Sequence, residues 1–151
     1  MNSVITVLIV DDNLLTLEII KGYFESTEIV EFKCITLDDP LLVIEKTIEH
    51  KPDFIVLDVF MPKRNGLNVC EDLFNNPETS QIPVMFLTSS ESLDDRGKAF
   101  LFGSIAYFRK GDDIQDMIRT IILHDSLTPI RKALDRLSSV TKEVESNYHH
   151  Q

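Results

Sequence analysis

The chain has 151 residues, which is enough for one domain with a full hydrophobic core and a short appendage. Apolar residues make up 43% of it, and its formal net charge of −10 disfavours nucleic acid as a partner while suiting divalent cations or basic protein surfaces. No apolar stretch is long enough to span a bilayer, and the N-terminus lacks the pattern of a signal peptide. We therefore expect a cytoplasmic protein without membrane contact.

Two kinds of apolar pattern alternate along the chain. Short runs rich in β-branched residues are typical of buried strands, whereas apolar residues three and four positions apart are typical of helices. In chain order these patterns predict strand 4–10, helix 14–24, strand 30–36, helix 40–48, strand 54–58, helix 67–75, strand 84–88, helix 93–102, strand 105–108 and helix 114–123. Five such alternations with short connections predict a parallel sheet with helices on both faces.

Local signals mark several helix ends. Asn13 or Asp12 would cap the first helix, Pro40 fits the first turn of the second, and Gly103 fits the position just beyond the fourth. The two cysteines, Cys34 and Cys70, show no metal-ligand spacing. We interpret both as buried small hydrophobic residues in a reducing compartment.

The C-terminal segment follows a different pattern. Residues 125–129 include a proline and interrupt the helical pattern, so we place one domain at 4–125 and a helical tail or linker at 126–151. Apolar or semi-apolar residues then recur near heptad spacing, at Ile130, Leu134, Leu137, Thr141, Val144 and Tyr148. Fewer than three heptads leave three interpretations open: a coiled coil, one amphipathic helix packed on its own domain, or a linker helix to an output domain.

Polar residues stand where the predicted strands end. Asp11 and Asp12 follow the first strand, Asp58 ends the third, Thr88 ends the fourth and Lys110 follows the fifth. A lone Asp58 would be interpreted as a helix cap or a turn residue. Parallel strands, however, bring all five residues to one edge of the sheet, where α/β proteins bind their ligands.

Three carboxylates at one sheet edge repel one another, so the cluster predicts a cation. Mg²⁺ suits it because this ion prefers carboxylate, carbonyl and water oxygens and commonly shares them with phosphate. Lys110 adds a second positive charge and Thr88 a hydroxyl. The set therefore predicts a phosphoryl site in which a carboxylate can be converted to an aspartyl-phosphate.

The ordered set of strand-end residues resembles the receiver domain of two-component response regulators. The resemblance covers residues 4–124 and is carried by Val10-Asp11-Asp12, Leu57-Asp58 with Met61-Pro62 and Gly66, Leu87-Thr88-Ser89, Gly103-Ser104 with Tyr107, and Lys110. It implies a flavodoxin-like (CheY-like), doubly wound α/β fold. The expected sheet has five parallel strands in the order 2-1-3-4-5, with five helices and, here, a C-terminal helical extension.

The resemblance implies a metal site and a phosphoacceptor. Asp58 matches the phosphoacceptor of the family. Asp12 matches the direct Mg²⁺ ligand, Asp11 the ligand that acts largely through water, and Phe60 the residue whose backbone carbonyl completes the protein oxygens on the metal.

The resemblance also implies a conformational switch. Thr88 matches the hydroxyl that moves toward the phosphoryl group, and Lys110 the lysine that pairs with Asp58 or its phosphate. Tyr107 matches the aromatic residue that rotates inward as the threonine moves. Without this match, Tyr107 would be interpreted as an ordinary aromatic residue of the core or the surface.

Two positions depart from the family pattern. Gly111 stands after Lys110, where receivers usually have a proline in a cis peptide, so the loop has either a cis bond before a glycine or an equivalent turn reached through the wider dihedral range of glycine. Phe60 is bulky and apolar where small or polar residues are common. We expect Phe60 to hinder an attacking water and to slow loss of the phosphate, with the hydroxyl of Ser90 partly countering it.

The resemblance implies a signalling phosphoacceptor rather than an enzyme. It would take its phosphoryl group from a sensor histidine kinase or a phosphotransfer protein and signal to an output domain or a downstream protein, without contacting nucleic acid itself. The alternative is a pseudo-receiver that binds partners without phosphorylation. A phosphatase of the haloacid dehalogenase type is disfavoured because Phe60 stands where a second acid is needed. A homodimer would form through the fourth-helix, fifth-strand and fifth-helix face or through the tail.

Overall fold

The computed structural model describes residues 4–111 and 113–149. Within these residues, five strands form one parallel sheet in the order β2-β1-β3-β4-β5, which confirms the expected topology. The strands are β1 (Val4–Val10), β2 (Glu31–Leu37), β3 (Phe54–Leu57), β4 (Val84–Thr88) and β5 (Ala106–Arg109). Each differs from its predicted bounds by at most one residue at either end.

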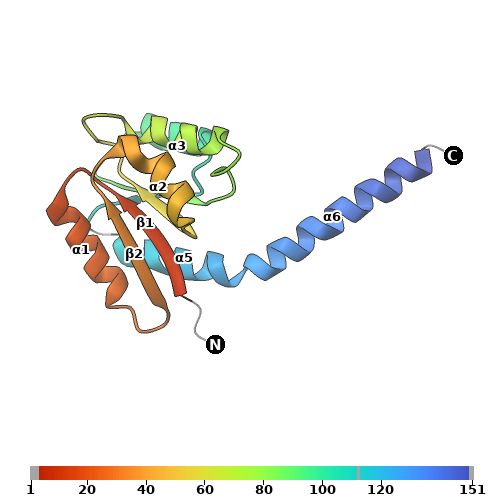
Figure 1. Cartoon of the computed structure of the whole chain (residues 1–151), viewed down its shortest axis with the longest axis horizontal. Coiled ribbons are helices and arrows are strands. Elements are labelled where there is room, and N and C mark those ends of the chain that lie inside the picture. The colour runs from red at the N-terminus through yellow and green to blue at the C-terminus, as the bar shows by residue number, and fades with distance from the viewer. Residues whose placement is uncertain (1–3, 112, 150–151) are drawn as a thin grey trace. The chain divides into compact units, whose positions relative to one another are not determined.

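Helices alternate with the strands along the chain (Figure 1). They are α1 (Leu14–Glu25), η1 (Pro40–Leu42), α2 (Val43–His50), α3 (Gly66–Asn75), α4 (Leu93–Leu101), α5 (Ile114–Ser126) and α6 (Thr128–His149). Asn13 is the cap of α1, because its side chain accepts a hydrogen bond from the backbone N–H of Thr16. The predicted helix 40–48 is divided, with a 3₁₀ turn at η1 preceding α2.

Alternate residues of the strands face opposite sides of the sheet, and both sides are buried. On one side, Leu8, Ile55 and Phe86 belong to a core cluster that includes residues of α2, α3 and α4. Figure 1 shows α2 and α3 together on one side of the sheet. The intervening residues Val7 and Met85 are also fully buried. The sheet is therefore covered on both faces, as its continuous apolar runs predicted.

The strand β3 is central in the sheet, and all four of its residues are buried. Directly after it, the backbone N–H of Asp58 donates to the carbonyl of Val10 at 3.2 Å. The strand β1 ends at the same edge of the sheet, and there the N–H of Asp11 donates to the carbonyl of Leu37. These backbone bonds fix the positions of both aspartates beyond the strands.

The two cysteines differ in burial. Cys70 is buried on α3, as predicted, whereas the prediction for Cys34 is wrong in part, because this residue is only half-buried. The reason is its place on β2, an edge strand in which only Phe32 and Leu37 are buried. Burial raises the pKa of the Cys34 thiol to about 11 and that of the Cys70 thiol to about 12, so both thiols are protonated at neutral pH.

The chain divides into two compact units, residues 1–118 and 119–151. In the second unit only Leu127 separates α5 from α6, so the predicted interruption at 125–129 is a single turn residue. The N–H of Leu127 donates to the carbonyl of Leu123, and the guanidinium of Arg131 donates to the carbonyl of His124 and the hydroxyl of Thr128. Among the described residues, no helix is long and apolar enough to cross a membrane.

Candidate functional site: an acidic cluster at the sheet edge

Three aspartates meet at the carboxyl edge of the sheet. Asp11 and Asp12 follow β1, Asp58 follows β3, and one carboxylate oxygen from each lies within 4.8 Å of the others. Asp11 and Asp58 are 2% and 4% exposed, whereas Asp12 is exposed to solvent. The sequence predicted this convergence from the strand ends alone. The burial of two acids makes their mutual repulsion costly without a cation.

Lys110 supplies one positive charge to this cluster. Its ammonium donates to Oδ2 of Asp58 at 2.8 Å and lies 2.6 Å from Oδ2 of Asp11. Burial lowers the pKa of Lys110, but the bonds to Asp11 and Asp58 outweigh it and raise the pKa above its ordinary value. Lys110 is therefore a permanent cation between the two buried carboxylates.

Both oxygens of Asp11 have a partner. Its Oδ1 accepts a hydrogen bond from the N–H of Asn13, and its buried Oδ2 is paired with the Lys110 ammonium at 2.6 Å. Burial raises the pKa of Asp11, and Lys110 and the N–H of Asn13 offset this rise only in part. Three clustered carboxylates against the single charge of Lys110 leave an excess of negative charge that fits a hard divalent cation.

The loop after β3 holds Asp58 from its other side. The N–H of Phe60 donates to Oδ1 of Asp58 at 3.3 Å, so both oxygens of this carboxylate have a partner. The Phe60 side chain is 54% exposed and is thus at the surface beside the buried acid. The N–H of Gly66 donates to the carbonyl of Val59 and closes the loop at the start of α3.

The turn after Lys110 uses the conformational range of glycine. Gly111 has φ +93°, and the described residues contain no cis peptide bond. The loop therefore makes its turn through the wider dihedral range of glycine and has no cis bond before Gly111. The N–H of Lys110 donates to the carbonyl of Thr88 at 2.9 Å, so the lysine is held against the end of the neighbouring strand before the turn begins.

We expect Gly111→Ala to lower the free energy of unfolding by about 1 kcal/mol, because L side chains rarely adopt this positive φ. The effect is conformational, since a Cβ at Gly111 would meet nothing within 4 Å. Urea denaturation measures it. Gly97→Ala is the matched control, because Gly97 is equally open but helical, and its replacement should raise stability. Equal effects of the two substitutions would contradict this account of the turn.

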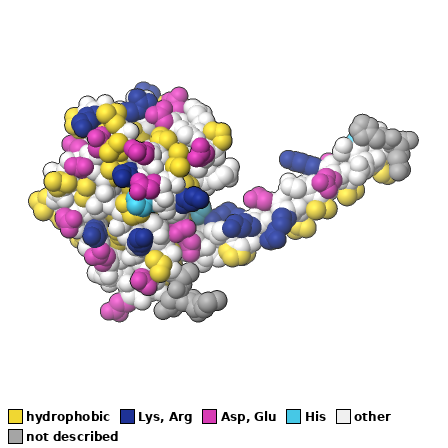
Figure 2. Space-filling model, viewed as in Figure 1, with side chains coloured by type: hydrophobic (Ala, Val, Ile, Leu, Met, Phe, Trp, Pro, Cys, Tyr) yellow, Lys and Arg dark blue, Asp and Glu magenta, His cyan; other side chains and the backbone are white. Residues whose placement is uncertain are grey.

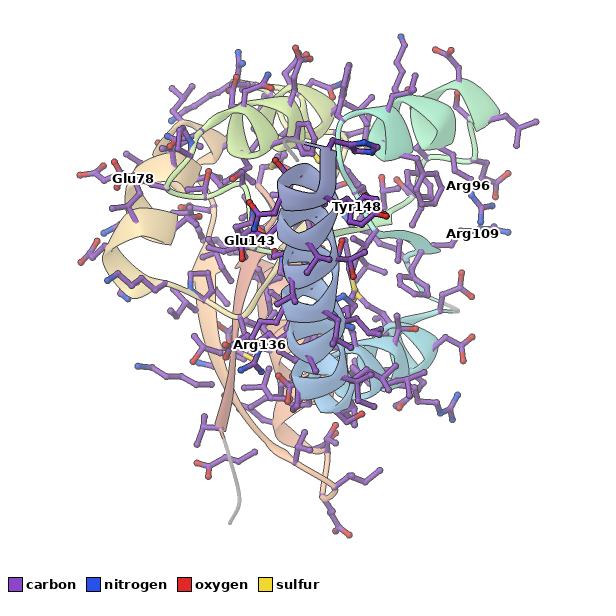
Figure 3. All side chains as sticks on the ribbon, turned by 90° about the vertical axis from the view of Figure 1, so that its right-hand side faces the viewer. Glu78, Arg96, Arg109, Arg136, Glu143 and Tyr148 are labelled. Carbon is purple, nitrogen blue, oxygen red and sulfur yellow. The ribbon has the colours of Figure 1, made fainter. Side chains whose placement is uncertain are left out.

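The residues named for the switch are connected through Ser90. The Ser90 N–H donates to Oγ1 of the fully buried Thr88 at 3.2 Å, and the hydroxyl of the half-buried Tyr107 donates to the Ser90 carbonyl at 3.2 Å. Burial raises the pKa of Tyr107, which keeps this hydroxyl a donor. The guanidinium carbon of Arg96 lies 6.0 Å from the centre of the Tyr107 ring. Figure 3 shows Arg96 and Arg109 on the same side of the molecule.

The Ser90 side chain has a role that sequence reasoning missed. Its hydroxyl donates to Oδ2 of Asp95 at 2.6 Å, in the first turn of α4, and so joins the end of β4 to that helix. The hydroxyl is engaged with Asp95 in this structure, and its partial countering of Phe60 at the phosphoryl site stays a prediction. The spacing of Ser92 and Asp95 signals the start of α4, where Ser92 accepts the N–H of Asp95, but it does not reveal the bond from Ser90.

Known proteins resemble this chain in sequence. The chain is 29% identical over 98 residues to the DNA-binding dual master transcriptional regulator RpaA of a Synechocystis species, which covers 65% of this chain and 38% of that protein. It is 28% identical over 116 residues to the polar-differentiation response regulator DivK of Brucella anthropi, covering 77% of this chain and 92% of DivK. The chain thus spans well under half of the first relative and most of the second.

The fold has solved counterparts as well. The BeF3-activated N-terminal receiver domain of RstA from Klebsiella pneumoniae has a TM-score of 0.70 at 22% identity, covering 79% of this chain and 97% of that domain. Residues 7–122 match the family described as the response regulator receiver domain, and this range runs from the middle of β1 through most of α5. This match covers most of the chain and agrees with the observed strand order. It shows that the chain belongs to the response regulator receiver domain family.

Proposed function

We propose that the chain is a phosphorylatable receiver whose phosphoacceptor is Asp58. The observation that carries the proposal is the contact of the Lys110 ammonium with the buried carboxylates of Asp58 and Asp11, within a cluster of three aspartates. In the transfer, an oxygen of Asp58 forms a bond to phosphorus while the bond from phosphorus to the donor breaks. The donor is a sensor histidine kinase or a phosphotransfer protein.

Different residues of the chain would hold the metal ion and neutralise the phosphoryl oxygens at this site. Asp11, Asp12, Asp58 and the backbone carbonyl of Phe60 would hold Mg²⁺, which supplies charge neutralisation for the phosphoryl oxygens. The Lys110 ammonium, already 2.8 Å from Asp58, would pair with the new phosphate. The Phe60 N–H beside Asp58 supplies a further donor.

The switch would proceed through Thr88 and Tyr107. A dianion on Asp58 attracts the Thr88 hydroxyl, and to reach it Oγ1 must give up the hydrogen bond that it accepts from Ser90. The Ser90 carbonyl holds the Tyr107 hydroxyl and the Ser90 side chain holds Asp95 on α4. Movement of Thr88 would therefore bias both the tyrosine and the first turn of α4.

The proposed protein is a signalling phosphoacceptor with a receiver at 4–125 and a tail or linker at 126–151. A row of exposed apolar side chains on α1, Leu15, Ile19 and Tyr23, supports a protein partner there, such as the kinase or phosphotransfer protein. The signal would pass to an output domain or a downstream protein in the cytoplasm. The charge of −10 supports a chain that does not contact nucleic acid itself.

The test is intact mass spectrometry after incubation with Mg²⁺ and acetyl phosphate. A working receiver acquires one phosphoryl adduct that is lost again on standing, because aspartyl-phosphates hydrolyse. A chain that binds Mg²⁺ but never acquires the adduct would be the pseudo-receiver, an interaction module that works without phosphorylation. The same sample without Mg²⁺ is the control.

We expect Mg²⁺ to stabilise the folded chain. At ten times its dissociation constant, an ion that binds only the folded state adds about 1.4 kcal/mol to the free energy of unfolding. Thermal denaturation with and without Mg²⁺ measures this. Asp12→Asn should abolish the response, whereas Asp94→Asn, an exposed acid on α4 outside the cluster, should keep it. A full response in Asp12→Asn would exclude Asp12 as a ligand.

Phe60 is expected to prolong the phosphorylated state by shielding the phosphate from water. We expect Phe60→Asn to shorten the half-life of the adduct about tenfold, equivalent to 1.4 kcal/mol in the barrier. The time course of adduct loss measures it. Phe74→Asn is a matched control, since Phe74 is also 54% exposed but lies on α3, near the C-terminal end of that helix. An unchanged half-life in Phe60→Asn would rule out the shielding role.

A further inference from the structure

The helix α6 has an apolar face made of exposed residues. None of its residues is buried, and the apolar members of its heptad positions are 56–79% exposed. We define the α6 stripe as these heptad positions: Ile130, Leu134, Leu137, Thr141, Val144 and Tyr148. Their alternating spacing of four and three residues is that of a coiled-coil seam. Figure 2 shows hydrophobic side chains following one another along this helix.

We propose that the α6 stripe packs against the α6 stripe of a second copy of this chain, with the two helices antiparallel. The antiparallel register places Leu137 of one copy beside Thr141 of the other, Leu134 beside Val144, and Ile130 beside Tyr148. Symmetry repeats each pair, so the seam has six layers. The interface is isologous and closes as a dimer.

Charge favours a second copy as the occupant. The chain carries −10 overall, but residues 128–149 contain four Lys or Arg and three Asp or Glu, so the tails can approach without bringing the acidic charge together. The first half of α6 is basic on balance, with three cations against Asp135, and the second half is acidic on balance, with Glu143 and Glu145 against Lys142. Antiparallel pairing brings the basic half of one helix to the acidic half of the other.

The positions flanking the stripe also favour the antiparallel orientation. In that register Arg131 of one copy flanks Glu145 of the other, and Val140, which is 55% exposed, meets its own counterpart at the twofold axis. A parallel pair would instead place Val140 beside Glu145 and leave Arg131 beside Ser126. The antiparallel pair therefore combines an ion pair with an apolar contact, where the parallel pair has neither.

The polar member of the stripe is compatible with a buried seam. The Thr141 hydroxyl donates to the carbonyl of Leu137, one turn earlier, at 3.0 Å. This bond gives the hydroxyl an acceptor inside its own helix. Burial of Thr141 in the seam would therefore leave no donor without a partner. Figure 3 shows Arg136 and Glu143 projecting from one side of α6 and Tyr148 from the other, so these charges point away from the stripe.

Sedimentation equilibrium of the full chain tests the dimer. We expect a monomer–dimer equilibrium, and Leu137→Glu should raise the dimer dissociation constant about a hundredfold or more, because it places a charge in two layers of the seam. Ser139→Glu adds the same charge on the exposed opposite face and should change the constant by about twofold at most. A chain that is monomeric at all concentrations, or whose dimer survives Leu137→Glu, overturns the proposal.

Disulfide trapping tests the orientation, in a Cys34→Ser background that removes the half-buried native thiol. Val140→Cys lies at the twofold axis of the antiparallel pair and should form a disulfide-linked dimer under oxidised glutathione. Val144→Cys meets itself only in a parallel pair and should stay monomeric on a non-reducing gel. Linkage of Val144→Cys without linkage of Val140→Cys would overturn the antiparallel orientation.

A charge exchange gives an independent readout of the same register. Arg131→Glu and Glu145→Arg should each raise the dissociation constant about threefold to tenfold, because each creates like-charge pairs on both flanks. The double variant should dimerise more tightly than either single variant, since it restores both ion pairs with the charges reversed while the bonds of Arg131 to His124 and Thr128 stay lost. Additive losses in the double variant would show that these residues do not meet and would also overturn the register.

Discussion

Asp58→Asn is expected to abolish the phosphoryl adduct of the chain while leaving the fold intact. An amide is not a nucleophile, and it removes the charge that Lys110 pairs with at 2.8 Å. The amide oxygen can still accept the Phe60 N–H, so the loop after β3 keeps its bond to this side chain. Intact mass after incubation with Mg²⁺ and acetyl phosphate should show the unmodified variant alone.

Asp53→Asn is the matched control for this result. Asp53 precedes the same strand at its opposite end, where its carboxylate accepts the N–H of Thr6. It is therefore an acid beside the opposite end of β3, remote from the carboxyl edge, and its replacement should leave adduct formation unchanged. An adduct on Asp58→Asn would assign the phosphoacceptor to another carboxylate, with Asp11 and Asp12 the first to examine by peptide mapping.

The convergence of the acids was predictable because it depends on topology more than on detail. A short apolar run ending in an acid, such as 54–58, identifies a buried parallel strand, and parallel strands with helical crossovers all end at one edge. Asp11, Asp58 and Lys110 consequently meet despite long separations in sequence. Errors of one residue in the strand bounds do not change which edge a residue occupies.

Details that depend on tertiary contacts were not predictable in the same way. The bond from Ser90 to Asp95 requires the exact angle between β4 and α4, which no spacing encodes. The half-exposure of Cys34 follows from the place of β2 at the sheet edge, whereas its own residue type favours burial. At Lys110 and Gly111 both backbone alternatives were compatible with the sequence, and only the observed φ of Gly111 distinguishes them.

Gly66→Ala is expected to have the largest effect on stability, a loss of about 3 kcal/mol in the free energy of unfolding. A Cβ on Gly66 would lie 1.8 Å from the backbone carbonyl oxygen of Asp58 and 2.8 Å from its carbonyl carbon. These are backbone atoms that no rotamer change can move. Alanine favours a helix over glycine by only about 1 kcal/mol, so the clash decides the sign.

The same clash connects stability to function, because the atoms displaced belong to the phosphoacceptor residue. The N–H of Gly66 also donates to the carbonyl of Val59, so relief of the clash must shift the loop that holds Asp58. Gly66→Ala should therefore reduce the adduct yield as well as the unfolding midpoint in urea. Gly22→Ala is the control, since Gly22 lies in α1 with nothing within 4 Å of its Cβ, and it should raise stability. Wild-type stability in Gly66→Ala would mean that α3 can move away from the Asp58 carbonyl without cost. The close contact between Gly66 and this carbonyl would then not be what holds Asp58 in position.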